Sequence, residues 1–550
     1  MAKGPNHQNP VGKVQRTLAL RFLGILISFC IVALGQPARV GWLGAVAAAG
    51  GFCLFFYALP PTRRFLIGTV WFTLVQLVQL SWMTAIEFQG IYILFVYAVV
   101  ALVIGCQFGL LTLCIPSSGK ISFSRVLSLA ALWTIMEWIR LFVVCGFSWN
   151  PIGLALTHYK TSLQFASVFG VYGLSFWVML VNLLVLNFCR MRGKTLALPL
   201  CLACIPYLFG WVQLTTHSGD KHAKTLDVVL IQTAWLPSQK TPHPDRMHEF
   251  IEPIEQWWSI FKSIKENPHC DLIALPEAAV PFQSDFSFYR YSDAKQMLMM
   301  EFGRDVVQAF PPLKAPFAEP RVLKNEKIWC VSNLFFCQVL ANLYKAEVVV
   351  GLDHADAVIK KNFNSAFYFK PGSDELDRYD KQILLPLGEY LPYEWMRPWT
   401  RSYGIFDFFS HGVGTKIFGR KVPFSVSICY EETFPSIMRD ARAKGAELFV
   451  NLTNDNYYPD STLHEQHFFH ARLRAVENGI PLIRACNAGI TAVIDHFGQK
   501  KAVLGSGEGV LNHRLTIERV PTLFALWGDS GIITLSLCIL LFSWQRKSRA

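Results

Sequence analysis

Long runs of uncharged, apolar residues fill positions 18–213 of this sequence and return only near its C-terminus. A helix that crosses a bilayer needs about 20 such residues, so we expect seven transmembrane helices in this region and an eighth near residues 523–543. The composition agrees, because 52% of the residues are hydrophobic and only 16% are charged. The seven expected helices lie at residues 18–34, 41–59, 65–86, 91–115, 126–145, 163–188 and 195–213.

The basic residues that flank these runs predict how the chain is oriented. If the N-terminus is cytoplasmic, the cytoplasmic segments carry most of the flanking Lys and Arg, including Arg63, Arg64 and Arg190. The short loops on the other side carry only Arg39 and Lys160. This asymmetry favours two cytoplasmic termini. The net charge of +12 is therefore interpreted as an orientation signal, and no nucleic-acid binding is expected.

Three domains follow from this pattern. We expect an N-terminal membrane domain over residues 1–213, an extracytoplasmic globular domain over 214–520, and a C-terminal transmembrane helix with a basic cytoplasmic tail over 521–550. Within the globular domain, short apolar strands such as LDVVLIQ, DLIALPE and ELFVNLT alternate with amphipathic helices. This alternation predicts a layered α/β fold.

Three strand or loop ends carry residues whose side chains could take part in catalysis. Glu277 follows DLIALP, Lys381 lies in RYDKQILLPLGEYLPYEW, and Cys429 ends the strand VPFSVSIC. Alone, the first two are typical of surface charges, and most of the fourteen cysteines are typical of small buried hydrophobes. Together they could supply a thiol nucleophile, a carboxylate base and an ammonium group that stabilises an oxyanion. Spacing alone does not establish that the three meet.

The histidine-rich stretch HEQHFFH at residues 464–470 invites a zinc interpretation. However, the HExxH motif requires one more residue between its histidines. We therefore expect no metal site here.

Four ordered motifs resemble a known family. LPEAAVPF, DKQILLPLGEYLPYE and ICYEETFP resemble the Glu, Lys and Cys motifs of the nitrilase (carbon–nitrogen hydrolase) superfamily. The block from NLTNDNYYPD to DHFG, the GFSWNPIG stretch and the eighth helix resemble its membrane-embedded branch, the apolipoprotein N-acyltransferases. The resemblance implies a polytopic α-helical membrane domain of eight transmembrane helices joined to an α/β nitrilase-like αββα sandwich.

The same resemblance implies roles for single residues. Glu277 would be the general base, Lys381 the oxyanion stabiliser and Cys429 the nucleophile. The implied supporting residues are Glu389, Tyr430 and Glu431, and the residues of a possible lipid portal are Phe147 and Trp149. Glu432, which follows the signature, is expected to be a solvated charge.

The implied activity is a ping-pong acyl transfer without metal or cofactor. Cys429 would take the sn-1 acyl chain of a phospholipid, with phosphatidylethanolamine as the expected donor. The acceptor would be the free α-amino group of the diacylglyceryl-cysteine of an apolipoprotein. The implied protein is a monomer in the inner membrane of a bacterium, with its catalytic domain in the periplasm. Two alternatives stay open: a membrane-tethered amidase that uses water as acceptor, and an inactive lipid-handling scaffold.

Two segments depart from the family pattern. A surplus around residues 285–330 separates Glu277 from Lys381, and it could be an arm over the lipid entrance or a tolerated surface insertion. The second departure is NDNYYPDS, where the branch more often has Trp and Phe after Asn-Asp. A lipid-facing loop with a changed shape here would alter the acyl-chain or head-group preference.

Overall fold

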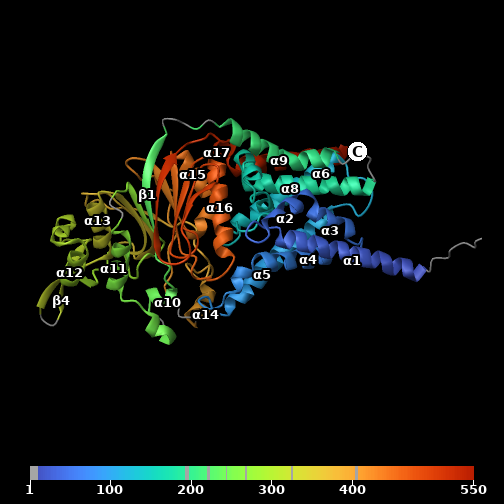
Figure 1. Ribbon diagram of the computed structural model, residues 1–550. Helices are drawn as coiled ribbons and strands as arrows, with labels where there is room; N and C mark the ends of the chain where they lie inside the picture. The colour runs from blue at the N-terminus through green and yellow to red at the C-terminus, as the bar shows by residue number, and fades with distance from the viewer. Residues whose placement is uncertain are drawn as a thin grey trace, which may run out of the picture.

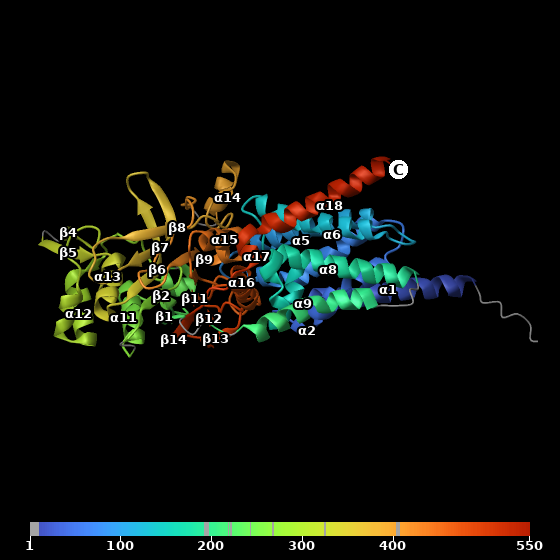
Figure 2. The ribbon, with the colours of Figure 1, turned by 90° about the horizontal axis from the view of Figure 1, so that it is seen from above.

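The structure is a computed structural model that describes residues 10–549 except 192–196, 218, 220–222, 243, 267–268, 324–325 and 403–406. The molecule is elongated, with a bundle of long helices at one end and β-sheets at the other (Figure 1). A view from above shows the same division, with the C-terminal helix α18 (Asp529–Arg549) returning along the bundle (Figure 2).

Five helices of the bundle have the length and composition to cross a membrane. They cover Gln15–Leu34, Gly41–Ala58, Tyr92–Cys114, Ala166–Met191 and Ala197–Thr216. Two further apolar helices, Arg64–Gln79 and Asp529–Gln545, are shorter, and α6 (Phe123–Ile139) belongs to neither group. The several apolar helices confirm a polytopic membrane domain, whereas the expected number of eight spans is not established by these criteria. The bounds of the N-terminal helices are α1 Pro10–Leu34, α2 Gly41–Val46, α3 Phe52–Ala58, α4 Arg64–Gln79, α5 Tyr92–Cys114, α6 Phe123–Ile139, α7 Lys160–Leu163, α8 Ala166–Met191 and α9 Ala197–Thr216.

Small residues let two of these helices pack closely. A side-chain carbon added at Gly68 of α4 would lie 2.6 Å from the Thr112 side chain of α5, and one at Gly109 would lie 2.2 Å from Thr69. Such close approach is typical of helix pairs in membranes, because van der Waals packing rather than the hydrophobic effect stabilises their association there.

Two sheets form the centre of the globular domain. The six-stranded sheet has the order β14-β1-β2-β6-β7-β8, and the five-stranded sheet has the order β13-β12-β11-β10-β9. The strand β14 pairs with β1 in antiparallel register from Lys224↔Ile517 to Gln232↔Gly509. The strand bounds are β1 Lys224–Gln232, β2 Leu272–Leu275, β6 Glu347–Asp356, β7 Lys361–Phe369, β8 Asp377–Asp380, β9 Phe424–Ile428, β10 Leu448–Thr453, β11 Leu482–Cys486, β12 Ala492–Ile494, β13 Lys500–Val503 and β14 Gly509–Ile517.

The two-residue alternation along the strands builds the layers. In β1, Val228 and Leu230 face the core between the sheets, whereas Val229 and Ile231 face the outer helices. Helices α11 (Pro253–Ile264) and α13 (Asn333–Tyr344) cover that outer face. Residues of α15 (Pro435–Ala443) and α16 (Leu463–Asn478) share a core cluster with residues of the five-stranded sheet and of the membrane helices. Because α16 also packs against α8, the αββα sandwich joins the bundle through its own helix layer (Figure 1).

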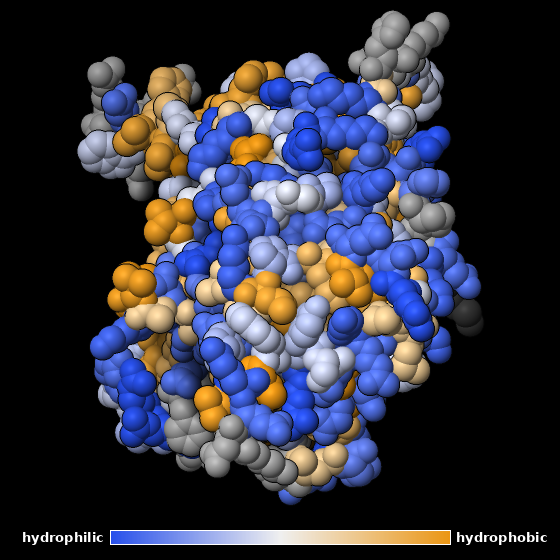
Figure 3. All heavy atoms as spheres, turned by 90° about the vertical axis from the view of Figure 1, so that its left-hand side faces the viewer, coloured by the Kyte–Doolittle hydropathy of each residue, from blue (hydrophilic) through white to orange (hydrophobic). Residues whose placement is uncertain are grey.

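The surplus segment around residues 285–330 forms a small subdomain whose buried residues, such as Leu298 and Phe317, share one core with the outer helices of the sandwich. It contains α12 (Tyr291–Phe302) and most of the three-stranded sheet β3-β5-β4, whose strands are β3 Tyr289–Arg290, β4 Ala318–Leu323 and β5 Glu326–Val331. Both ribbon views place this subdomain at the end of the molecule opposite the membrane helices. The interpretation as an arm over a lipid entrance is therefore wrong. Hydrophilic residues cover most of this distal end (Figure 3).

Candidate active site

Cys429 stands on a sharp turn directly after a buried strand. The strand β9 ends at Ile428, a 3₁₀ turn runs over Cys429–Thr433, and α15 begins at Pro435. The backbone φ of Cys429 is +51°, a left-handed conformation that non-glycine residues rarely adopt and that is common at functional sites. The turn leaves Cys429 partly accessible although its neighbours are buried.

Lys381 lies between two carboxylates at the same site. Its Nζ atom is 3.1 Å from Oε1 of Glu277 and 2.7 Å from Oε1 of Glu389. The Lys381 side chain is completely buried, and those of Glu277 and Glu389 are nearly so. Glu277 lies 104 residues before Lys381 in the sequence, and the fold brings the two into direct contact.

Asn364 on β7 completes this cluster, and sequence reasoning missed it. Its Nδ2 atom donates to Oε1 of Glu277 at 2.8 Å and to Oε1 of Glu389 at 3.1 Å. Gly351 on β6 was also missed. A side-chain carbon there would lie 2.5 Å from the Cα atom of Glu277, so only glycine lets the strand pass this close.

The charges of the cluster act on Cys429. Burial raises the pKa of the Cys429 thiol well above its ordinary value, the nearby charge of Glu277 raises it further, and Lys381 opposes both. Burial acts to lower the pKa of Lys381, but Glu277 and Glu389 outweigh it and raise that pKa well above its ordinary value. The resting site therefore holds a protonated thiol beside an ammonium group and two carboxyl groups, and the thiol needs a base before it can attack.

Glu431 fastens the Cys429 turn to the loop that carries Lys381. Its Oε1 atom accepts hydrogen bonds from the backbone N–H groups of Gln382, at 2.6 Å, and Ile383, at 3.2 Å. Its Oε2 atom accepts one of 2.8 Å from the N–H of Ile428. Glu431 is fully buried, and this burial raises its pKa to about 7. Both oxygens of Glu431 are thus engaged by backbone N–H groups of the two segments.

Glu432 is fully buried, so the expectation of a solvated charge is wrong. Its Oε2 atom lies 3.6 Å from Nε of Arg484 and 3.9 Å from Nε2 of His467. Arg484 and His467 also contact Asp455, at 3.4 and 2.9 Å. His467 thus belongs to a buried charge network, and its Nε2 lies 3.2 Å from the carbonyl oxygen of Cys429.

The GFSW stretch of the membrane domain contacts the Cys429 turn directly. The Tyr430 hydroxyl donates to the Gly146 carbonyl at 3.2 Å and lies 3.3 Å from the backbone N of Ser148. Trp149 is buried, stacks on Tyr430 with a centroid distance of 5.8 Å, and donates from Nε1 to Gln466 at 2.7 Å. It therefore lies in the contact between the two domains.

Phe147, the other residue expected at a lipid portal, is half-buried against the same core.

Lys240 is a further residue near the site, and no sequence pattern pointed to it. It is buried, and its Nζ donates to the carbonyl of Ala278, the residue after Glu277, at 2.6 Å. Burial lowers the pKa of Lys240 to about 8.

Two family models match this chain. The model described as "Carbon-nitrogen hydrolase" matches residues 230–522, more than half of the chain, and the model described as "Apolipoprotein N-acyltransferase N-terminal domain" matches residues 27–184. Both matches fall on the parts of the chain that form the sandwich and the helical bundle.

Full-length relatives carry the same description. An apolipoprotein N-acyltransferase of Chlamydia caviae is 29% identical over 551 residues, which cover 94% of this chain and 96% of the relative. The protein of the same name from Chlamydia pneumoniae is 27% identical over 560 residues, with the same coverage. An apolipoprotein N-acyltransferase from Sinorhizobium medicae is 28% identical, and the match covers 92% of this chain and 85% of the relative. This chain therefore belongs to the carbon–nitrogen hydrolase family, in the branch of the apolipoprotein N-acyltransferases.

Proposed function

We propose that this protein transfers an acyl chain from the sn-1 position of a membrane phospholipid to the α-amino group of the diacylglyceryl-cysteine of apolipoproteins. The observation that carries the proposal is the direct contact between the nucleophile turn and the membrane domain, made by Tyr430 with Gly146. A thiol held against a helical bundle in this way is placed for substrates that arrive in the bilayer.

The first half of the reaction loads the enzyme. Glu277 takes the proton of the Cys429 thiol, and the sulfur attacks the ester carbonyl carbon. Lys381, with the backbone N–H of Tyr430, stabilises the oxyanion that forms. The ester C–O bond then breaks, and the glycerol oxygen takes the proton from Glu277. The lysophospholipid departs, and the acyl chain stays on Cys429 as a thioester.

The second half of the reaction transfers the acyl chain from Cys429 to the lipoprotein. The free amine of the lipoprotein attacks the thioester carbonyl, Glu277 takes a proton from the amine, and the Cys429 sulfur leaves and is protonated again. Asn364, Glu389 and Glu431 hold these groups in place. The membrane-side location of the turn supports exclusion of water from the thioester, because water would otherwise hydrolyse it.

We further propose eight transmembrane helices, with domain limits at 1–213, 214–520 and 521–550. The shorter helices α4, α6 and α18 support this number, because they pack side by side with the five longer ones. Ser543 of α18, for example, hydrogen-bonds with Ser124 of α6 at 3.0 Å. Both termini are then cytoplasmic and the sandwich periplasmic. A fluorescent reporter that folds only in the cytoplasm should give signal when fused after residue 550, and none when inserted at the hairpin tip near Val358.

The donor is proposed to be phosphatidylethanolamine and the working protein a monomer in the bacterial inner membrane. Purified protein should be incubated with this lipid carrying a labelled sn-1 chain, and then with a diacylated lipopeptide. We expect a hydroxylamine-sensitive label on Cys429 that the lipopeptide amine removes, and no label in Cys429→Ala. If the wild type lost the label to water as fast without the lipopeptide as with it, a tethered amidase would be favoured. If the wild type acquired no label, a scaffold would be favoured.

A further inference from the structure

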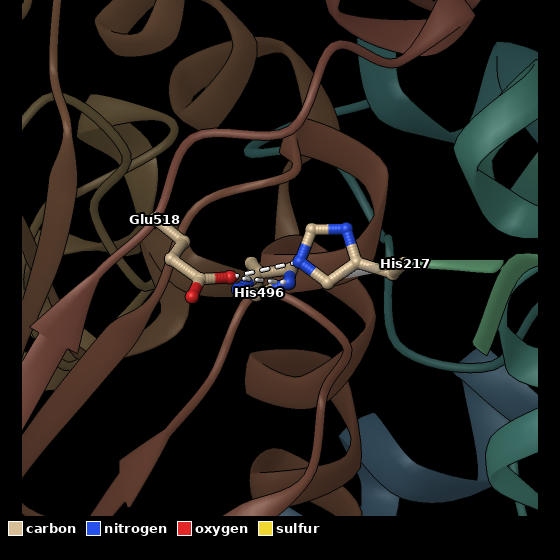
Figure 4. Close-up of side chains that lie close together, drawn as sticks. All are labelled: His217, His496 and Glu518. Carbon is tan, nitrogen blue, oxygen red and sulfur yellow. Dashed lines mark hydrogen bonds and ion pairs between the residues drawn. The ribbon is translucent and has the colours of Figure 1, made fainter. Parts of the chain in front are cut away.

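A second cluster of reactive side chains lies away from Cys429, where the chain passes between the membrane bundle and the sandwich. His217 directly follows the last residue of α9, and Glu518 directly follows β14. His496 lies in the turn between β12 and β13. The cluster therefore joins the segment that enters the sandwich, the segment that leaves it and a hairpin of the five-stranded sheet (Figure 4).

The three side chains converge on one point. Nε2 of His217 lies 2.9 Å from Oε2 of Glu518, and Nε2 of His496 lies 3.4 Å from the same oxygen. One ligand atom from each residue falls within 4.8 Å of the others. In a tetrahedral zinc site with bonds of about 2.1 Å, neighbouring ligand atoms are about 3.4 Å apart. The observed spacing therefore needs only small adjustments to hold such an ion.

One ring nitrogen in the cluster has no hydrogen-bond partner. His496 is 7% exposed, and its Nε2 atom is buried without a hydrogen bond although it faces Glu518. Buried polar atoms are nearly always satisfied. A cation bound between His496, His217 and Glu518 would give the Nε2 atom of His496 a partner, because it would accept the lone pair of that nitrogen.

The surroundings hold the two imidazoles in place. Phe497 packs against both rings, with centroid distances of 4.9 Å to His217 and 4.1 Å to His496. The carbonyl of Phe497 accepts a hydrogen bond of 3.0 Å from Gln164, which follows α7 in the membrane bundle. The cation of Lys501 is paired with Asp495 at 3.1 Å, so its charge is partly neutralised. The His217 side chain is 28% exposed, which leaves solvent a route to the site.

We propose that His217, His496 and Glu518 bind a zinc-class divalent cation that fastens the sandwich to the membrane bundle. Two imidazole nitrogens and one carboxylate oxygen suit Zn²⁺ better than Mg²⁺ or Ca²⁺, which prefer oxygen ligands. Both ring nitrogens donate lone pairs as neutral imidazoles, and the fourth position is open to water. The site is structural and separate from the Cys429 chemistry.

The test measures zinc binding by the full-length protein in detergent after N-ethylmaleimide has blocked its accessible thiols, so that cysteines do not compete. We expect one zinc per chain by titration calorimetry and by elemental analysis after gel filtration. His217→Ala and Glu518→Gln should each weaken zinc affinity at least about tenfold. The matched control is His248→Ala, whose side chain is 80% exposed outside the cluster and which should bind zinc like the wild type.

Thermal unfolding gives a second readout, because a ligand that binds only the folded state raises the midpoint. Zinc should raise the midpoint of the wild type and of His248→Ala, and should not raise that of His217→Ala. Since His217 is partly exposed, its substitution leaves the core intact, and an unchanged elution profile will establish this. The proposal is overturned if the wild type binds no zinc, or if His217→Ala and Glu518→Gln bind it as tightly as the wild type. Neither result depends on acyl transfer, so the proposed function is tested separately.

Discussion

The carboxylate of Glu431 accepts a hydrogen bond of 2.6 Å from the backbone N–H of Gln382, the residue directly after Lys381. The same side chain accepts a hydrogen bond from Ile428, the residue directly before Cys429. A single buried carboxylate thus sets the distance between the proposed nucleophile and the proposed oxyanion stabiliser. The need for an acceptor for these N–H groups accounts for the acidic residue that stands two positions after the cysteine.

Replacing Glu431 with Gln should therefore lower the rate of thioester formation about tenfold or more. The amide keeps the shape but puts an NH₂ group where backbone N–H donors need an acceptor, and a hydrogen bond to a charged group contributes about 1.5–3 kcal/mol. Single-turnover labelling of Cys429 measures the effect. Glu375→Gln is the control, because its side chain is 84% exposed. Equal rates for Glu431→Gln and the wild type would contradict this role.

Lys381→Met should have a larger effect. It removes the cation between Glu277 and Glu389, and the loss of one partner from a buried ion pair typically costs about 3–5 kcal/mol of stability. Loss of an oxyanion-stabilising group slows the chemical step by about 10²–10³. Acylation rate and thermal unfolding measure the two effects separately.

The control for Lys381→Met is Lys416→Met, which removes a surface ion pair with Asp377 whose side chains are about half exposed. This variant should match the wild type in rate and nearly match it in stability. If Lys381→Met kept the wild-type acylation rate, Lys381 would have no part in stabilising the oxyanion.

Sequence patterns predicted the sandwich better than they predicted its site. The strand DLIALP and the turn after VPFSVSIC appear where expected, because apolar runs bounded by turn residues are local signals. Asn364 and Gly351 escaped notice because their importance comes from strands that become neighbours only in the folded sheet. Glu432 was misread for a related reason, since its partner Arg484 lies on the distant strand β11 and a buried ion pair leaves no local pattern.

Asn364→Ala should lower the acylation rate about 10- to 100-fold through the loss of hydrogen bonds to charged groups. Single-turnover labelling of Cys429 measures this rate. Asn342→Ala is a matched control, since its amide donates to Ala309 away from the site. It should lower stability and leave the acylation rate unchanged. A wild-type acylation rate in Asn364→Ala would argue for a purely structural role.

Trp149→Phe separates a role in domain contact from a role in a lipid portal. The change removes the 2.7 Å hydrogen bond to Gln466, so we expect a loss of about 1–3 kcal/mol of stability and an unchanged preference among donor acyl-chain lengths. Trp258→Phe, which removes an exposed hydrogen bond to Glu301, is the control. A changed chain-length preference at unchanged stability would instead favour the portal role.

Asp455 should make stability depend on acid pH. Burial acts against its ionisation, but His467 and then Arg484 outweigh it and lower the Asp455 pKa to about 2, from an ordinary value of 3.8. The folded state therefore binds this proton less tightly than the unfolded state. The resulting stabilisation is complete above pH 3.8 and is lost as the pH falls towards 2.

The shift corresponds to about 2 kcal/mol, and Asp455→Asn tests it. The difference in unfolding free energy between the wild type and this variant should shrink by about that amount as the pH falls from 6 to about 2.5, measured by denaturant unfolding in detergent. Asp374→Asn is the control, because Asp374 is half exposed and its difference from the wild type should stay near zero. A difference for Asp455→Asn that stays constant on acidification would mean that the Asp455 carboxylate is not stabilised by His467 and Arg484.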